Sequence, residues 1–312
     1  MLLNIQDLID DAKCFATVRE LRWPNGITCP TCGSTQINKR GFHDRQPHRQ
    51  RYRCQQCRGH FDDLSETIFE GHHQPLKVWM VCLYLMGLNL SNQQIAAELD
   101  LNKDDVQQMT TQLRQGVVAK KKPVILEGEI EGDEVYIVAG HKGNPLAVAK
   151  QGRPGRRRRL KGCRGRGTLA TEKPPIFGLL QRGGQVVIQM LANVQQATIK
   201  PIIQATVKAG SLIYTDEYDI YHRLPEWGYA HQTVNHSAGE YARDDDGDGF
   251  CEVHVNTMEG FWSLLRSWLR PHRGISQEKL PLYLGFFEFV HNVRRRGKAL
   301  FPALLSLLLA AP

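Results

Sequence analysis

The chain has 312 residues, of which 41% are hydrophobic and 23% charged, and this ordinary globular composition excludes a wholly disordered chain, a collagen-like fibre and a coiled coil. Its 40 basic and 32 acidic residues give a formal net charge of +8, so a polyanionic partner is the first expectation. No run reaches the roughly 18 apolar residues of a membrane-spanning helix, and no basic region of a secretory signal opens the chain. We therefore expect a cytoplasmic protein that has no membrane partner and, at about 150 residues per domain, roughly two domains.

Two closely spaced cysteine pairs are the first chemical signal along the chain. Cys29 and Cys32 form one CxxC pair, Cys54 and Cys57 form another, and 21 residues separate the pairs. Two thiolates on each tight turn complete the tetrahedral geometry of structural zinc, although the separation lies just beyond the usual window of roughly 15 to 20 residues. Four thiolate ligands leave no open coordination position, so we expect a structural Zn²⁺ ion. Four unrelated thiols and a redox CxxC pair are the alternatives.

The stretch between the two cysteine pairs is basic, and Asp44 is its only acid. A face that contacts phosphates is favoured slightly over a solvated charged face. The basic residues of this stretch are Lys39, Arg40, Arg45, Arg49, Arg51 and Arg53.

The region from residue 66 to 122 is predicted to be helical, beginning with a buried helix from Leu76 to Met86. Ser91 caps a short helix and Asn102 caps a second one. Two such helices joined by a tight turn fit a helix-turn-helix that reads DNA, with a plain helical hairpin as the alternative. The apolar stripe of the two helices consists of Ile95, Ala96, Leu99, Val106, Met109 and Leu113. A basic run before Pro123 marks a linker, so we place the zinc ribbon in 1–65, the helical region in 66–122 and the next domain in 123–312.

The second half of the sequence alternates between strand and helix patterns. A strand over 129–138 contains Asp133, an acid that is costly inside a strand unless it serves a function. A short apolar strand over 211–216 ends in Asp216. The tail over 299–312 is expected to be a core or docking helix, although Pro302 interrupts it. The other predicted elements are strands over 176–180, 185–191 and 229–234 and helices over 197–208, 255–270 and 277–293.

This order of elements matches the ribonuclease-H-like integrase layout. The predicted fold class is therefore a multidomain α+β and α/β protein with a zinc ribbon, a helix-turn-helix and a ribonuclease-H-like catalytic domain. In this layout an acid on the first strand and one at the end of the fourth converge with a third acid from a later helix, and Asp133, Asp216 and Glu259 fit these positions. Such acids hold two Mg²⁺ or Mn²⁺ ions roughly 3.5–4 Å apart, which clamp the attacking and leaving oxygens of a phosphodiester displacement.

Motifs along nearly the whole chain carry a resemblance to a known family. They are CPTCG at 29–33, YRCQQC at 52–57, ETIFEGHHQPLKVW at 66–79, GDEVYI at 132–137, YTDEYDIY at 214–221, VNHS at 234–237 and HVNTMEGFWSLLR at 254–266. In these motifs the chain resembles bacterial insertion-sequence transposases of the zinc-ribbon, ISXO type with a DDE catalytic domain. The resemblance implies a nucleoid-associated enzyme that binds terminal inverted repeats, cuts DNA to free 3′-hydroxyls and joins them to target DNA, as a homo-oligomer in the DNA complex.

The third catalytic position has two candidates in this chain. The family shows Asn or Glu there, and Asn256 and Glu259 lie three residues apart, on one face of the predicted helix. We favour Glu259 because a carboxylate is the better ligand for a hard ion. Seven residues further on, Arg266 stands where the family usually has Lys, and either cation can hold a phosphate.

A basic segment interrupts the second domain at 150–167. We expect it to be a flexible insertion that lies on DNA phosphates, with a solvated loop as the alternative. Its expected DNA-binding residues are Arg156, Arg157, Arg158, Arg159, Lys161, Arg164 and Arg166.

The leading hypothesis is an active transposase. The alternative is a catalytically inactive DNA-binding regulator derived from a transposase, and the presence of all three acids favours the enzyme. A zinc-ribbon adaptor of the transcription machinery would leave the second domain unexplained.

Overall fold

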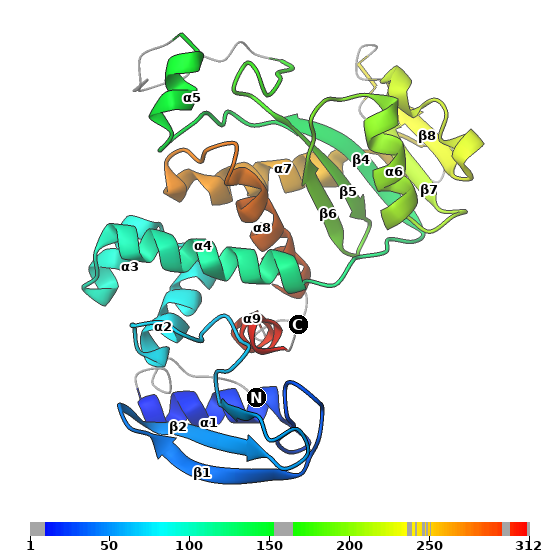
Figure 1. The fold of residues 1–312 in the computed structure, drawn as a ribbon. Coiled ribbons are helices and arrows are strands. Elements are labelled where there is room, and N and C mark those ends of the chain that lie inside the picture. Colours follow the sequence, from blue (N-terminus) through cyan, green and yellow to red (C-terminus); the bar gives the residue numbers. More distant parts are fainter. Residues whose placement is uncertain are drawn as a thin grey trace. The chain divides into compact units, whose positions relative to one another are not determined.

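The computed structural model describes residues 10–152, 165–235, 239–240, 242–244, 247, 249, 251–294 and 300–310. The chain forms two compact units, one of Met1–Lys121 with Val293–Pro312 and one of Lys122–Asn292 (Figure 1). The boundary between the two units lies between Lys121 and Lys122. The structure differs from the expected 123–312 domain at its C-terminal end, because the segment from Val293 onwards packs with the first unit. Within the described ranges, none of the helices combines the length and apolar character that crossing a membrane requires.

The first unit begins with a helix and a small antiparallel sheet. Helix α1 spans Asp11–Arg22, and strands β1 (Ile37–His43), β2 (Gln46–Cys54) and β3 (His60–Asp62) pair in the order β1-β2-β3. Along β2, Tyr52 and Cys54 are buried while Arg51 and Arg53 lie on the opposite face, as the two-residue period of a strand requires. The inward face carries an aromatic core in which the Tyr52 ring centroid lies 5.2 Å from that of Phe61 and 5.6 Å from that of Trp23.

Four further helices complete the first unit: α2 (Leu76–Gly87), α3 (Asn92–Leu99), α4 (Lys103–Lys120) and α9 (Leu300–Leu309). The predicted caps are confirmed, since Ser91 forms a capping box with Gln94 and the Asn102 side chain accepts from the N–H of Asp104. Asp100 adopts a left-handed conformation (φ 52°) and turns the chain between α3 and α4. The structure thus contains the expected helix pair, and its role in DNA reading remains a prediction.

Helix α9 supplies part of the core of the first unit, where it packs against α1, α2 and α4 (Figure 1). Its residues Leu304, Leu305 and Leu308 are fully buried. A side chain at Gly116 of α4 would come within 2.7 Å of Leu308, so the glycine permits the close approach of the two helices. Pro302 does not break α9, because it lies in the first turn, where backbone N–H groups have no partner within the helix.

The second unit is built on a five-stranded mixed sheet. Strands β4 (Glu129–Tyr136), β5 (Pro175–Gln181), β6 (Val186–Met190), β7 (Leu212–Asp216) and β8 (Ala230–Val234) occur in the order β6-β5-β4-β7-β8. Strands β6, β5 and β4 are antiparallel neighbours, whereas β4, β7 and β8 run parallel. This order and these directions agree with the expected ribonuclease-H-like layout.

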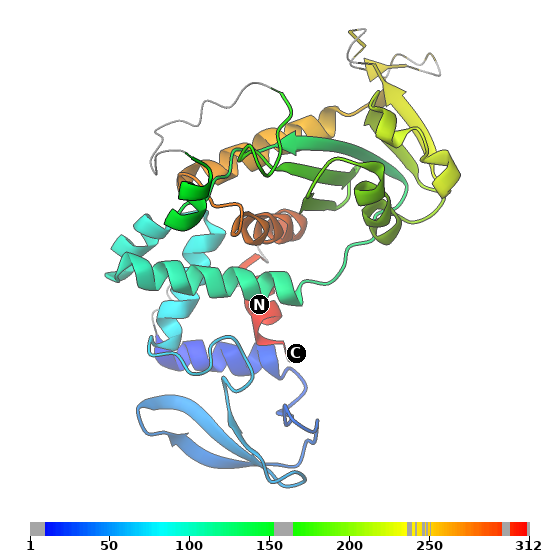
Figure 2. The ribbon, with the colours of Figure 1, turned by 45° about the horizontal axis from the view of Figure 1, so that its top comes forward.

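Helices cover both faces of this sheet (Figures 1 and 2). Helix α6 (Gln196–Thr206) buries Ile199 and Ile203 against Ile130 and Ile213, while α7 (Asn256–Leu269) packs on the opposite face of β4 and β5. Helix α8 (Leu280–Arg294) lies at the outer strand, where Asn292 exchanges two 2.9 Å hydrogen bonds with the Val186 backbone and so covers an otherwise open edge. Shorter elements are α5 (Pro145–Lys150), which the sequence reading did not predict, β9 (Ala242–Arg243) and β10 (Val253–His254).

Candidate active site

The four cysteines of the two CxxC pairs form one cluster, with all their sulfur atoms within 4.8 Å of one another. Cys29 Sγ lies 3.6 Å from Cys57 Sγ, and Cys32 Sγ lies 3.6 Å from Cys54 Sγ. A tetrahedral ion with bonds of about 2.3 Å would separate its ligands by about 3.8 Å, so the cluster fits one zinc ion. Backbone hydrogen bonds, chiefly from Cys57, lower the pKa of Cys54 to about 6 and favour the thiolate that a metal needs.

The two predicted strand acids lie level with each other on neighbouring parallel strands. Glu129 of β4 pairs with Leu212 of β7, and Glu131 pairs with Tyr214. Continuing this register by two residues brings Asp133 beside Asp216, which is the last residue of β7. Paired residues of parallel strands point to the same face, so both carboxylates are directed toward the face that α7 covers.

Asp133 is the centre of an acidic site. Burial is the main reason that its pKa rises to about 6, and the nearby carboxylates of Asp216 and Glu259 raise it further. The indole N–H of Trp262 donates a 2.9 Å hydrogen bond to Asp133 Oδ2. The structure therefore brings the three predicted acids into one electrostatic neighbourhood.

The acids are less tightly gathered than the cysteines. Among the described residues, the four cysteines are the one group of three or more potential ligands whose donor atoms all lie within 4.8 Å of one another. Glu259 lies in the first turn of α7 and is exposed, as are Asn256 at its start and Arg266 near its end.

Glu134 is a fourth acid that the sequence reading missed. It follows Asp133 on β4 and therefore points to the opposite face of the sheet, where the Tyr221 hydroxyl donates a hydrogen bond to it. Burial, followed by the charges of Asp133 and Asp216, raises the pKa of Glu134 to about 8. Four acids within six residues of β4 were the signal in the sequence that could have drawn attention to it.

One of the expected DNA-binding residues lies beside the acids. The guanidinium carbon of Arg166 lies 3.9 Å from the centre of the Tyr218 ring, and the Tyr218 N–H donates a 3.1 Å bond to Asp216 Oδ1. Arg166 also lowers the pKa of Glu134, against the stronger effect of burial. The other expected residues of this group, Arg156, Arg157, Arg158, Arg159, Lys161 and Arg164, lie outside the described residues.

A buried carboxylate holds the start of α7, and the sequence reading missed this residue too. Glu131 is fully buried on β4 and accepts hydrogen bonds from the Met258 N–H (2.8 Å), the Thr257 hydroxyl (2.8 Å) and Arg182 Nε (2.9 Å). Because Val255 provides no side-chain cap, Glu131 takes the place of a cap at the positive end of the helix dipole. Arg182 also bonds the carbonyl oxygens of Glu252 and His254, which lead into α7.

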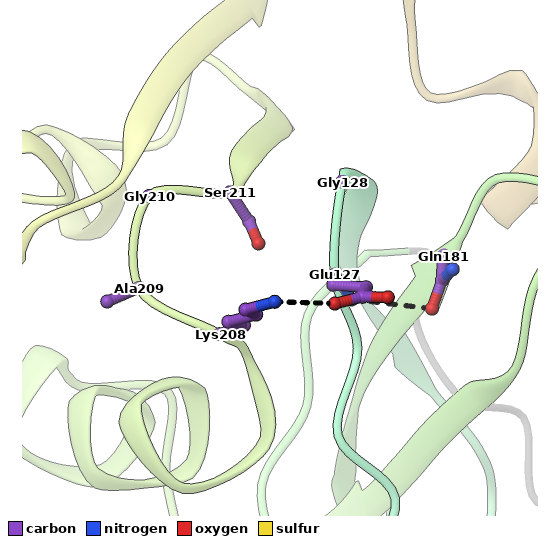
Figure 3. Close-up of a pocket in the computed structure, with 7 residues that line it drawn as sticks. All are labelled: Glu127, Gly128, Gln181, Lys208, Ala209, Gly210 and Ser211. Carbon is purple, nitrogen blue, oxygen red and sulfur yellow. Dashed lines mark hydrogen bonds and ion pairs between the residues drawn. The ribbon is translucent and has the colours of Figure 1, made fainter.

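A surface hollow of about 460 Å³ lies at the other end of the sheet (Figure 3). Gly128 precedes β4 and Ser211 precedes β7, so the hollow borders the ends of these strands that are opposite to Asp216. The ion pair of Lys208 with Glu127, 2.9 Å long, crosses it. The hollow is therefore separate from the acids. Its lining residues are Glu127, Gly128, Gln181, Lys208, Ala209, Gly210 and Ser211.

Comparisons with known proteins identify both parts of the chain. Residues 125–292 match the ISXO2-like transposase domain, and residues 9–60 match the transposase zinc-ribbon domain. The chain is 31% identical over 309 residues, 98% of its length and 99% of the relative's, to an uncharacterized protein in transposable element ISH50 of Halobacterium salinarum. It is also 33% identical over 110 residues, 35% of its length and 81% of the relative's, to an uncharacterized transposase-like protein of Haemophilus influenzae.

Solved structures show only distant similarity. A pre-cleavage Mos1 transpososome aligns over 77% of this chain and 80% of that chain, with 12% identity and a TM-score of 0.29. The simian T-cell lymphotropic virus intasome in complex with the PP2A regulatory subunit B56 gamma aligns over 67% and 68%, with 10% identity and a TM-score of 0.28. Similarities of this size carry no argument about the site.

Proposed function

The chain belongs to the insertion-sequence transposases with an ISXO2-like transposase domain and a zinc ribbon, and on this premise we propose that it cuts DNA at the ends of its element and joins the freed 3′-hydroxyls to target DNA. The observation that carries the proposal is that the carboxylates of Asp216 and Glu259 lie close enough to raise the pKa of Asp133, and that Asp133 and Asp216 each lie two residues beyond the last residue pair of neighbouring parallel strands. Carboxylates that destabilise one another in this way are suited to share a cation.

The donor set fits hard divalent ions such as Mg²⁺ or Mn²⁺, since it consists of carboxylate oxygens. Bound there, such ions would stabilise the charge on the attacking and leaving oxygens of the phosphodiester. Asp133 and Asp216 would hold the ions from the sheet, and Glu259 would add a carboxylate from α7. We propose Glu259 as the third ligand and Asn256 as a neighbour with a smaller effect. Arg266, two turns further along the same helix, would contact a DNA phosphate.

A structural zinc ion at Cys29, Cys32, Cys54 and Cys57 is the second metal that we propose, and the geometry of the four sulfur atoms supports it. The ion would fix the two turns that hold the small sheet of the ribbon. It would take no part in the chemistry, because four thiolates leave no position for a substrate.

We propose that DNA phosphates contact the outward face of the ribbon sheet and the edge that carries the acids. Arg40 and Arg53 lie on or beside that sheet face, and Arg166 lies against Tyr218 at the acidic edge. The helix pair is a less suitable phosphate surface, because Lys103 is the one exposed base among its exposed acids Glu98, Asp100, Asp104 and Asp105. The proposal also includes DNA contacts from the basic residues between 156 and 164. It further includes recognition of the terminal inverted repeats and assembly of a homo-oligomer on DNA.

The test is incubation of the purified protein with DNA that carries the element ends and their flanks, in Mg²⁺ or Mn²⁺, followed by mapping of the new 3′-hydroxyls. We expect nicks at the element ends in the wild-type protein and none in Asp133→Ala, with end binding equal in both. Binding without cleavage in either metal would overturn the enzyme and support the regulator that has lost catalysis.

A further inference from the structure

Trp262 of α7 is the residue that touches the central acid from the side away from solvent. Its side chain is buried, with 3% exposure, and its Nε1–H donates the 2.9 Å hydrogen bond to Asp133 Oδ2. An indole nitrogen can only donate, and a buried donor without an acceptor costs about 1–3 kcal/mol. The pairing therefore stabilises both partners in one arrangement.

We infer that Trp262 is a positioning residue for Asp133: its N–H bonds Oδ2 and, together with the Glu134 backbone N–H, fixes the carboxylate so that its remaining lone pairs can hold a divalent cation. This inference rests on the proposed metal-dependent function. Groups that hold a metal ligand from behind orient it, and their loss commonly weakens metal affinity about 10- to 100-fold.

Gly178 provides the space in which the indole lies. It pairs with Asp133 across β4 and β5, so a side chain there would point to the same face as the acid. A Cβ atom at Gly178 would overlap Met258 and come within 2.5 Å of the Trp262 ring. The absence of a side chain at this one position thus allows α7 to approach the sheet closely enough for the N–H to reach the acid.

The approach of α7 is fixed at a second point. Glu131 lies two residues before Asp133 on the same face of β4, and it bonds the Met258 N–H at the start of the helix. Met258 and Trp262 are four residues apart and therefore share one face of α7. Two acids of one strand thus hold one helix face, and a shift of α7 along β4 would break both contacts.

The direct test uses protein that keeps its zinc but is free of Mg²⁺ and Mn²⁺, labelled with ¹⁵N at its 5 tryptophans, which give separate indole signals in NMR spectra. Trp262→Phe assigns the signal of Trp262. We expect Asp133→Asn to shift that signal alone, and added Mg²⁺ to shift it in the wild-type protein. Glu127→Gln, two residues before β4 and paired with Lys208, is the matched control and should leave the signal in place. If the Trp262 indole signal does not shift in Asp133→Asn, the inference is overturned, whether or not the protein cuts DNA.

The functional test compares Trp262→Phe with Trp268→Phe, the same change on the same buried side of α7. We expect Trp262→Phe to raise the Mg²⁺ concentration for half-maximal cleavage about tenfold while DNA binding is unchanged. Trp268→Phe should leave this concentration at the wild-type value. If both variants need the same Mg²⁺ concentration for half-maximal cleavage, Trp262 contributes packing alone and does not position Asp133. If the wild-type protein itself does not cut, the proposed function fails, and the indole signals still test the inference.

Discussion

The cysteine cluster and the group of acids around Asp133 differ in how they are assembled. The cysteines come from two local turns, and their sulfur atoms already lie within 4.8 Å of one another. The acids come from β4, β7 and α7, which are distant in the sequence, and their arrangement depends on strand register and on Trp262 and Glu131 behind them. The difference teaches that the cysteine cluster is formed by local backbone turns, whereas the acids are brought together by the packing of segments that are distant in the sequence.

Metal removal should separate the two clusters most sharply. A chelator that removes zinc is expected to unfold the ribbon, because its aromatic core is small and zinc binding contributes about 10–16 kcal/mol in comparable peptides. Removal of Mg²⁺ should leave the second unit folded, since that unit has a large apolar core of its own. Limited proteolysis with mass spectrometry measures both effects. A protease-resistant ribbon in zinc-free protein would break the comparison.

Loss of an acid should stop the reaction and spare the fold. We expect Asp133→Ala and Asp216→Ala to lower the cleavage rate by about 10³ or more, roughly 4 kcal/mol, because each removes a proposed ligand of the ions that stabilise the transition state. End binding, measured by mobility shift, should not change. Glu259→Ala should behave alike and Asn256→Ala should be milder. The reverse ranking of these two would assign the third position to Asn256.

Charge on the ribbon should matter for DNA affinity rather than for the reaction. The double variant Arg40→Gln, Arg53→Gln is expected to reduce the salt dependence of end binding by about 2 in log–log slope, since each phosphate contact contributes about 0.9. Lys103→Gln, which removes the exposed base of the helix pair, is the control and should change the slope little. If Lys103→Gln lowers the salt slope more than the ribbon variant does, the helix pair and not the ribbon sheet supplies the main DNA contacts.

The smallest expected effect is a pH dependence confined to the acid site. In zinc-loaded protein without Mg²⁺ or Mn²⁺, burial raises the pKa of Asp133 to about 6 and that of Glu134 to about 8, so the folded state binds protons more tightly than the unfolded state. This stabilisation is complete below the ordinary carboxyl pKa values and is lost as the pH rises through 6 and 8. We expect the melting temperature of the second unit to fall between pH 5 and 9, and Mg²⁺ to reduce the fall. A melting temperature that rises over this range would contradict these pKa directions.

The sequence predicted the elements that depend on local signals. The CxxC turns, the caps at Ser91 and Asn102 and the five strands of the second unit all appear near their expected positions. Their signals lie within a few residues of the feature itself, in turn spacing, capping side chains and apolar periodicity.

The supporting residues of the acid site were not predicted, because their roles depend on contacts between distant segments. Gly178 has meaning only once β5 is paired with β4, and Trp262 looked like one more apolar residue of an amphipathic helix. The role of Glu131 depends on its partners in α7, which the sequence of β4 alone does not name. Helix α9 was expected to be a core or docking helix, but its leucine pattern does not indicate which unit it packs against.

The position of α9 has a consequence for how the protein is made. Synthesis proceeds from the N-terminus, and domains usually fold in that order as they leave the ribosome. Here the first unit cannot bury its helices until residues 300–309, near the end of the chain, have been translated. Until then α1, α2 and α4 expose the apolar surface that receives Leu304, Leu305 and Leu308, which marks an unfinished chain for proteolysis. The first unit is thus completed only after the second unit has been translated, and its stability depends on residues 300–309.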